Sequence, residues 1–211
     1  MKDSQITLVC FALKEEAGPF RRACAGRDGV SILLTGIGQA NASRAVANFL
    51  SKQSPALVFT CGFAGGLNPQ LTTGDVVFST EGGTIATRLT SAGATQAHVF
   101  CAERVAVTVA EKHALREQTG ADAVEMESGA IQSLCRERGI PCATVRVISD
   151  TANEDLPLDF NQLSKPDKNL DFGKLAVTLL KRPGKIPALL RLQKNCSLAS
   201  RNLSDVLMKV V

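Results

Sequence analysis

The segment from Ala123 to Asp155 carries the side chains best suited to chemistry in this chain of 211 residues. Among its side chains are the carboxylates of Glu127 and Asp150, together with Met126 and Arg146. A carboxylic acid can donate a proton to a leaving group, and a carboxylate can accept hydrogen bonds from hydroxyl groups. We therefore interpret this segment as one half of a ligand pocket.

The elements expected around these side chains would bring them to one edge of a sheet. Val124 ends a short apolar strand, residues 128–138 have a helical pattern, and residues 142–149 form a β-branched run that leads to Asp150. Ligands of α/β sheets bind at strand ends, where loops converge. The carboxylates of Glu127 and Asp150 are thus expected to face one cleft.

Strands and helices alternate along most of the chain. We expect strands at residues 6–13, 30–34, 56–60 and 76–79, and helices at residues 14–24 (interrupted by Gly18-Pro19), 39–52 and 109–119, the last opened by a capping box of Thr108 and Glu111. Residues 61–66 predict a glycine loop, and residues 80–93 a loop with at most one strand. The alternation predicts an α/β fold in a single domain over residues 1–211, a three-layer αβα sandwich with a mixed, mostly parallel central sheet.

The end of the chain has a different pattern. Residues 156–171 predict a loop able to lie over a pocket, and residues 172–211 a helical tail with helices at 172–181, 186–194 and 199–210. This tail holds much of the basic charge behind the formal net charge of +4. A solvated basic helical face is the simpler interpretation, and a contact with a membrane surface or a lipid-tailed substrate is the alternative. Nucleic-acid binding is disfavoured, because the tail offers aliphatic rather than aromatic side chains.

Composition also bounds the compartment. The seven cysteines are odd in number and form no CxxC pair, which predicts neither a disulfide framework nor a zinc site. The first apolar run, Ile6 to Leu13, is too short for a signal peptide and ends in charged residues. We expect a cytoplasmic protein with no integral membrane segment.

Four motifs in order carry a family resemblance: ALKEE at Ala12 to Glu16, TGIGQANAS at Thr35 to Ser43, CGFAGGLNPQLTTGDVV at Cys61 to Val77, and VEMES through VISD, ending at Asp150. The chain resembles the nucleoside phosphorylase and nucleosidase superfamily, which contains purine nucleoside phosphorylases, methylthioadenosine/S-adenosylhomocysteine nucleosidases and futalosine hydrolases. The runs AEKHALREQTGADAVEMES and RPGKIPALLRL look most like its hopanoid-biosynthesis-associated branch, whose implied substrate is adenosylhopane.

The resemblance implies an enzyme that cleaves the N-glycosidic bond of a 5′-modified, adenosine-type nucleoside. It implies no metal and no cofactor, with phosphate as a co-substrate only if the enzyme is a phosphorylase. It also implies a homo-oligomer, for which a dimer is favoured. A nucleoside-binding protein without turnover and a scaffold assembled through the tail are the rival interpretations.

Asp150 matches the family's acid, which protonates purine N7 as the base leaves. A free aspartate is ionised at neutral pH, so either the apolar run around it favours its protonated form or the proton is shared with N7. Ser149 could orient the carboxyl group. A purely structural role for Asp150 would be to cap the following turn.

Glu127 matches the carboxylate that accepts hydrogen bonds from both ribose hydroxyls, a geometry that also favours positive charge on the sugar. Met126 would pack on the ribose face, and Glu125 would give a supporting hydrogen bond. The structural alternative for Glu127 is a helix N-terminal carboxylate, worth ~0.3–1 kcal/mol through the helix dipole.

Glu16 matches the carboxylate that activates water in the nucleosidases, and Arg146 the arginine that helps to hold this water. Together they favour hydrolysis. Arg146 lies within an aliphatic strand, where an unpaired guanidinium is costly, so we expect a partner such as Glu127 or Glu16. A purely structural buried ion pair is the competing interpretation.

Phosphorolysis would need a phosphate site, for which the backbone amides of Gly36, Gly38 and Gly62 are the candidates. The chain departs from the phosphorylases at two positions. It has Thr60 where hexameric phosphorylases have an arginine, and Phe63 where the family usually has serine or threonine. These departures weaken the case for bound phosphate.

The remaining predicted contacts concern the base. Alanine and glycine permit close approach of a flat ring, so Ala64 and Gly65 in the glycine loop should form the floor under the purine. A pocket-closing aromatic is implied ten residues beyond the acid. The residues predicted for these contacts are Phe63, Ala64, Gly65 and Phe160.

Overall fold

The structure, a computed structural model, describes residues 6–163 and 172–211, and its centre is a sheet of eight strands within those ranges. The strands are β1 (Thr7–Phe11), β2 (Val30–Leu34), β3 (Leu57–Gly66), β4 (Val76–Thr80), β5 (Thr95–Gln96), β6 (Val99–Cys101), β7 (Ala123–Glu125) and β8 (Cys142–Asp150). Their order is β2-β1-β3-β8-β4-β5, with β7 pairing to β3 and β6. Only the β4·β8 and β3·β7 pairs among them are antiparallel.

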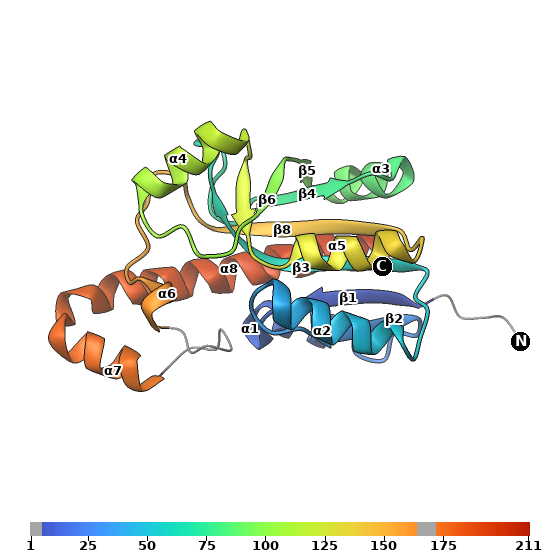
Figure 1. Cartoon of the computed structure of the whole chain (residues 1–211), viewed down its shortest axis with the longest axis horizontal. Helices are drawn as coiled ribbons and strands as arrows, with labels where there is room; N and C mark the ends of the chain where they lie inside the picture. Colours follow the sequence, from blue (N-terminus) through green and yellow to red (C-terminus); the bar gives the residue numbers. More distant parts are fainter. Residues whose placement is uncertain (1–5, 164–171) are drawn as a thin grey trace, which may run out of the picture.

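Helices cover both faces of this sheet (Figure 1). They are α1 (Lys14–Ala23), α2 (Gln39–Leu50), α3 (Gly83–Ala92), α4 (Val109–Thr119), α5 (Ser128–Glu137), α6 (Phe160–Leu163), α7 (Phe172–Lys181) and α8 (Ile186–Val210), with a 3₁₀ turn η1 (Pro183–Lys185) before α8. α1, α3 and α8 pack on one face, and α2 and α5 on the other. The predicted three-layer αβα sandwich is confirmed.

The pleat of β1 shows how sequence produces these layers. Val9 and Phe11 point to the face covered by α1 and α8, and Leu8 and Cys10 to the face covered by α2 and α5. A strand buried on both faces must be apolar at every position, because successive side chains point to opposite sides.

The pairing of β3 with β8 positions the candidate residues. Gly62 lies opposite Arg146, and Gly65 lies opposite Asp150 after a register shift between Ala64 and Gly65. Bulges of this kind re-aim side chains at the end of a strand. The predicted glycine loop at residues 61–66 is therefore wrong, since these residues continue β3.

Three other element predictions are wrong. Residues 80–93 contain helix α3, because Leu89 and Ala92 bury against the core although the segment is weakly patterned. α1 continues through Gly18-Pro19, since Ala17 and Phe20 anchor both sides of the proline in the core. α8 runs without a break past Asn195.

Other boundaries agree with expectation. The capping box of Thr108 and Glu111 is present at the start of α4, and Gly120 ends this helix in the left-handed conformation. Within residues 156–171 the short α6 interrupts the predicted loop, and residues 164–171 lie outside the described part of the chain. All seven cysteines are free.

The tail differs from the rest in its packing. Every buried residue of α8 lies at or beyond Ala199, and α7 with the first half of α8 extends past the end of the sheet (Figure 1). Among the described helices none is both long and apolar enough to span a bilayer.

Candidate active site

A buried guanidinium stands at the centre of the candidate site. Arg146 projects from β8, is fully buried, and ion-pairs through Nη2 with Glu125. The same nitrogen donates to Thr60 Oγ1 at 3.1 Å, and Nη1 lies 3.5 Å from Glu127 Oε2. The partner expected for Arg146 is therefore found, although Glu125 is closer than the predicted Glu127 or Glu16.

Glu125 and Glu127 have different surroundings. Glu125 accepts hydrogen bonds from the backbone N–H of Glu127 and from both the N–H and the hydroxyl of Ser128, so it is the carboxylate that caps α5. Glu127 instead reaches across to the N–H of Gly38, at 2.8 Å. Its side chain is thus not used as the cap that the structural alternative required.

Glu16 approaches the same arginine from α1. Its two oxygens accept from the backbone N–H groups of Leu13, at 2.8 Å, and Phe63, at 2.9 Å. A Cβ added to Gly62 would lie 2.6 Å from Glu16 Oε1 and 2.7 Å from Arg146 Nη1. Glycine at position 62 is what lets the carboxylate and the guanidinium face one another across β3.

Arg146 still has donors to spare. Its Nε and Nη1 are buried and make no hydrogen bond to any residue that the structure describes. Buried guanidinium nitrogens are costly to leave unpaired, so such atoms beside two carboxylates mark a place for a polar ligand or water.

Burial and neighbouring charges tune the three carboxylates differently. Burial, reinforced by the charge of Glu127, raises the pKa of Glu16 to about 7. Burial also raises the pKa of Glu127, against the opposing effect of Arg146. For Glu125 burial acts in the same direction, but the charge of Arg146 and the hydrogen bonds from Ser128 outweigh it and lower the pKa. Glu16 is therefore poised to exchange a proton near neutral pH.

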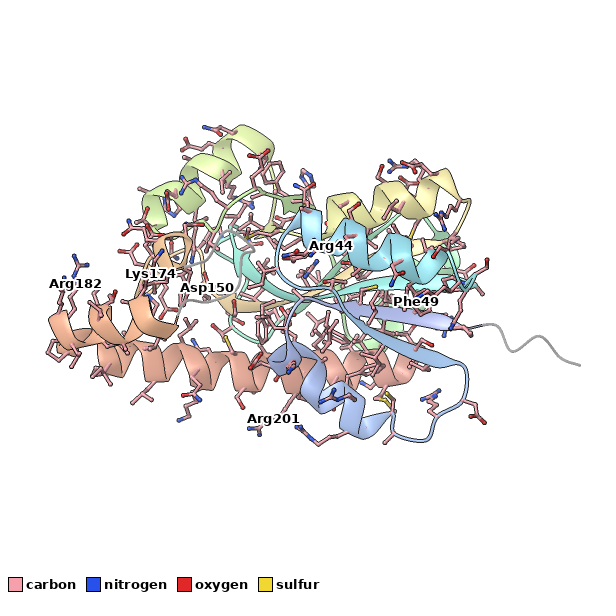
Figure 2. All side chains as sticks on the ribbon, turned by 60° about the horizontal axis from the view of Figure 1, so that its bottom comes forward. Arg44, Phe49, Asp150, Lys174, Arg182 and Arg201 are labelled. Atoms are coloured by element: carbon pink, nitrogen blue, oxygen red, sulfur yellow. The ribbon has the colours of Figure 1, made fainter. Side chains whose placement is uncertain are left out.

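Asp150 is the last residue of β8, four residues beyond Arg146 (Figure 2). Its Oδ1 accepts from the hydroxyl of Ser149 at 2.6 Å, and its Oδ2 accepts from Lys112 Nζ at 2.6 Å. Neither bond runs to the following turn, which is the contact that a capping role would need. The carboxylate is ion-paired, so the purely apolar setting expected from the sequence is wrong.

Lys112 is the residue that sequence reasoning missed. It comes from α4, is fully buried, and donates to the carbonyls of Thr151, at 2.7 Å, and Glu154, at 2.8 Å, as well as to Asp150. All three ammonium protons are thus used. A signal was present, because Lys112 lies three residues from both Val109 and Leu115 on the apolar side of α4, where a lysine must find a partner.

Two of the residues predicted for the base, Ala64 and Gly65, lie beside Asp150 or its neighbour Ser149. A Cβ on Gly65 would stand 3.3 Å from Asp150 Oδ2, and Ala64 is buried in β3 with its carbonyl accepting from Ser149. Met126, which lies between Glu125 and Glu127 in the sequence, is buried, and Phe63 is half-buried against the core. Phe160 begins α6 and is half-buried.

Two of the three predicted phosphate amides are occupied or enclosed. The N–H of Gly38 is taken by Glu127, and Gly62 is enclosed by Glu16 and Arg146. Gly36 has a positive φ of 80° and turns the chain before α2. An anion here would meet two carboxylates with a single guanidinium between them, which opposes binding.

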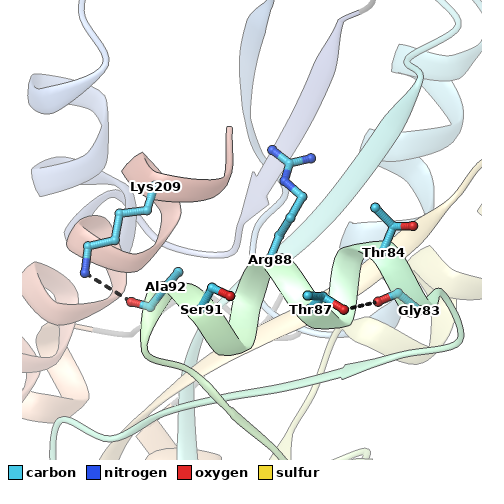
Figure 3. Close-up of a pocket in the computed structure, with 7 residues that line it drawn as sticks. All are labelled: Gly83, Thr84, Thr87, Arg88, Ser91, Ala92 and Lys209. Carbon is cyan, nitrogen blue, oxygen red and sulfur yellow. Dashed lines mark hydrogen bonds between the residues drawn. The ribbon is translucent and has the colours of Figure 1, made fainter.

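A surface cavity lies elsewhere in the molecule. It measures about 580 Å³ and is lined by α3 and the end of α8, including Thr87, Arg88 and Lys209 (Figure 3). β4, which leads into α3, pairs its last residue with Ala143 near the start of β8, so this cavity lies at the opposite end of the strand from Asp150. We assign the chemistry to the carboxylates because they are buried and paired, whereas this cavity holds no acid.

The part of the chain that the structure describes has no group of three or more His, Cys, Asp or Glu side chains arranged to hold a metal ion. His98 and His113 are both exposed and lie outside the candidate site.

Comparisons with known proteins agree with this fold. A futalosine hydrolase of Helicobacter pylori superposes with a TM-score of 0.75 at 14% identity, covering 98% of this chain and 97% of that one. The methylthioadenosine/S-adenosylhomocysteine nucleosidase of Neisseria meningitidis, in complex with methylthio-immucillin-A, superposes with a TM-score of 0.74 at 20% identity, covering 98% of each chain. These likenesses define the class of fold, that of nucleosidases.

Sequence comparison identifies the family. The 5′-methylthioadenosine/S-adenosylhomocysteine nucleosidase of Shewanella halifaxensis is 29% identical over 173 residues, which are 65% of this chain and 75% of that protein. The phosphorylase superfamily matches residues 11–103 and 95–181. The chain belongs to the phosphorylase superfamily, and the prediction of an enzyme that cleaves nucleoside N-glycosidic bonds is confirmed at that level.

Proposed function

We propose that this protein hydrolyses the N-glycosidic bond of an adenosine-type nucleoside that carries a modified 5′ group. The observation that carries this proposal is the pair formed by Glu16 and Arg146 Nη1, which face each other across Gly62. A base whose pKa is about 7, beside a guanidinium with donors to spare, is suited to hold and deprotonate one water molecule.

The ribose belongs beside Glu127 in this proposal. One oxygen of Glu127 is held by the N–H of Gly38 and the other lies toward Arg146, which fixes the plane of the carboxylate. As the bond to the base breaks, positive charge develops on the sugar. Carboxylates aimed at that charge from a buried site stabilise the transition state more than the ground state.

The departing purine belongs beside Asp150. N7 of a bound purine presents a lone pair, so a proton must lie between N7 and the carboxylate for the two to approach. When this proton moves to the purine, Asp150 is left with a full negative charge. The ammonium of Lys112, 2.6 Å away, compensates that charge without any rearrangement.

Hydrolysis is favoured over phosphorolysis on electrostatic grounds. A phosphate dianion would have to displace Glu127 from the N–H of Gly38 and sit among carboxylates. Water carries no charge and needs only one acceptor and one donor, which Glu16 and Arg146 supply. We propose that the reaction needs neither a metal nor a cofactor.

The relatives suggest the substrates to test. Two of them are named as methylthioadenosine/S-adenosylhomocysteine nucleosidases and one as a futalosine hydrolase. The purified protein should release free base from one of methylthioadenosine, adenosylhomocysteine, futalosine or adenosine in buffer without phosphate. Strict dependence on phosphate would overturn the hydrolytic proposal in favour of a phosphorylase of the kind that the hopanoid resemblance implies.

Matched variants assign the roles. Asp150→Asn and Glu16→Gln should each lower kcat by about 10²–10⁴-fold, the range for general acid and base groups, while nucleoside binding persists. Glu15→Gln, which removes the exposed carboxylate next to Glu16, is the control and should leave kcat unchanged. If no tested nucleoside turns over but adenine or methylthioadenosine still binds, the chain is a binding protein instead of an enzyme.

A further inference from the structure

The described part of the chain gathers its exposed large apolar side chains in the tail. We call residues 172–197 the basic hairpin; it comprises α7, η1 and the first half of α8. The exposed fractions are 50% for Val177, 82% for Leu180, 42% for Ile186 and 60% for Leu190, and Leu198 follows directly at 48%. Exposed aliphatic side chains gathered in one region mark a surface that contacts another protein or a membrane.

The spacing of these side chains places them on defined helix faces. Val177 and Leu180 are three residues apart on α7, and Ile186 and Leu190 are four apart on α8, so each pair shares one face. The more protected apolar residues, such as Leu175 and Leu189, fall on other faces. Both helices therefore expose an apolar stripe to solvent, in addition to the apolar side chains that are partly protected.

Charge in the basic hairpin has one sign. It contains six exposed basic side chains, Lys174, Lys181, Arg182, Lys185, Arg191 and Lys194, and no Asp or Glu. Lys181 follows Leu180 directly, and Lys194 lies one turn beyond Leu190 on the same side of α8. Apolar side chains interleaved with cations fit a surface that is itself both apolar and anionic.

Two other occupants fit less well. A second copy that met this surface through its own basic hairpin would bring like charges together, which opposes an isologous contact. A nucleic acid would pair with the cations but would leave the valine and leucine side chains without a function, since single strands bind to aromatic platforms. The basic hairpin contains one aromatic residue, Phe172, at its start.

The place of the basic hairpin in the molecule suits docking. It forms one end of the long axis, at the left of the view, so that a flat surface can reach it (Figure 1). Lys174 and Arg182 lie toward this end in a second view (Figure 2). The hairpin continues directly into the second half of α8, which packs against β8 and β3, the strands that carry Asp150 and Gly62.

We propose that the basic hairpin docks the protein on the surface of an anionic lipid bilayer, with Leu180 and Leu190 inserted at the headgroup boundary. The cations lie against acidic headgroups, and the aliphatic side chains leave water. Docking of this kind is reversible, and it holds the candidate active site close to the lipid surface.

Co-sedimentation of the full-length protein with vesicles tests this proposal. The wild-type protein should bind vesicles of phosphatidylglycerol and phosphatidylcholine in equal parts, should not bind pure phosphatidylcholine, and should be released by high salt. The K181Q/R182Q variant should bind about 25-fold more weakly, from roughly fivefold for each charge near the surface. R21Q/R22Q removes the same charge from exposed positions on α1 and should leave vesicle binding unchanged.

The apolar contribution separates the possible occupants. L180Q/L190Q keeps every charge, alters side chains that are already exposed, and should weaken vesicle binding about tenfold or more. If this variant binds as tightly as wild type, or if duplex DNA competes fully with the vesicles, the surface is a general polyanion site and the proposal is wrong. If the wild-type protein ignores vesicles but is a dimer that L180Q/L190Q dissociates, the occupant is a second copy and the proposal is equally wrong.

Discussion

At the scale of single residues, one guanidinium is shared by three carboxylates. Arg146 pairs most closely with Glu125, which is thereby kept ionised, and it is farther from Glu127. Its positive charge cannot neutralise three negative charges in a buried site, so the carboxylates least well supported by hydrogen bonds and charge hold their protons more strongly. Burial raises the pKa of Glu16, and the charge of Glu127 in this group raises it further.

The pH dependence of the rate reports this arrangement. A general base works only when deprotonated, so kcat/KM should fall about tenfold per pH unit below the pKa of Glu16, about 7, and should level off above it. Steady-state assays across the neutral range, with the best substrate, measure this limb.

The control for the pH profile is again Glu15→Gln, which should keep the limb. Glu16→Gln should remove it together with most of the activity. A rate that stays constant down to acidic pH in the wild-type protein would show that Glu16 is not the base.

Lys112 gives the second prediction at this scale. Lys112→Met removes the ammonium while keeping a long apolar side chain, and it leaves Asp150 buried beside the carbonyls of Thr151 and Glu154. We expect a loss of about 3–5 kcal/mol in the free energy of unfolding, because one partner of a buried pair is removed. We also expect kcat for the purine nucleoside to fall by about 10²-fold or more.

A substrate with a different leaving group separates these two effects. 4-Nitrophenyl riboside releases a phenolate that needs no protonation, so Lys112→Met and Asp150→Asn should cleave it at nearly the wild-type rate. If Lys112→Met loses as much activity on this substrate as on the purine nucleoside, the lysine is only structural.

At the scale of the elements, sequence reasoning succeeded where apolar runs are long. β1, β2 and β8 and the capped α4 lie where predicted, because buried strands and capping boxes leave local patterns. The continuation of β3 through its glycines was not predicted. Glycine weakens a strand, and here pairing with β7 and β8 supplies the stability. The helix α3 was missed because tertiary packing, not propensity, holds it.

The site could be predicted in part for the same reason. Glu127, Arg146 and Asp150 lie in one sequence segment; the structure pairs Arg146 with Glu127 and places Asp150 at the end of the strand that carries Arg146. Lys112 could not be placed, because its contact with Asp150 joins elements 38 residues apart. Glu125, and not Glu127, is the closest partner of Arg146. This choice depends on side-chain orientations, which a sequence pattern does not predict.

Gly62 offers a test of the strand as a positioning element. In Gly62→Ala the added methyl group would lie 2.6 Å from Glu16 Oε1, so Glu16 and Arg146 must separate. We expect activity to fall about 10²-fold, as a displacement of about 1 Å does in catalytic sites. The neighbours of the methyl group are side chains, but Gly62 has a φ of 153°, so the substitution also strains the backbone. Thermal unfolding measured beside the activity separates a loss of fold from a displacement of Glu16 and Arg146.

The control is Gly184→Ala in η1, where nothing lies within 4 Å of the new Cβ. It should leave activity unchanged. Full activity in Gly62→Ala would show that the spacing of Glu16 and Arg146 does not matter for the reaction.

At the scale of the whole molecule, one helix links the site to the tail. The second half of α8 packs on β8 and α1 through Leu203, Leu207 and Val210, while its first half belongs to the basic hairpin. The apolar core on that face therefore anchors α8, and the basic hairpin projects from it into solvent. A surface that binds the basic hairpin would orient the entire sheet, with the ends of β3 and β8 nearest to it.

The stability of the whole molecule should depend on pH through the same buried carboxylate. Glu16 has a pKa of about 7 in the folded state against 4.5 as its ordinary value, so ionisation favours the unfolded chain. This contribution to stability is complete below the ordinary value and is lost as pH rises through about 7, a difference of about 3 kcal/mol at most. Glu16→Gln cannot ionise, so between about pH 5 and about pH 8 it should lose less stability than wild type by up to that amount. Urea unfolding of the two proteins at both pH values measures the difference. Glutamine fails to accept one hydrogen bond from Leu13 or Phe63, but this loss is the same at both pH values. It therefore cancels when the change in the free energy of unfolding between the two pH values is compared. Equal losses in the two proteins would mean that Glu16 titrates in the folded protein as it does in water, and that the crowding of negative charge around Arg146 is relieved elsewhere.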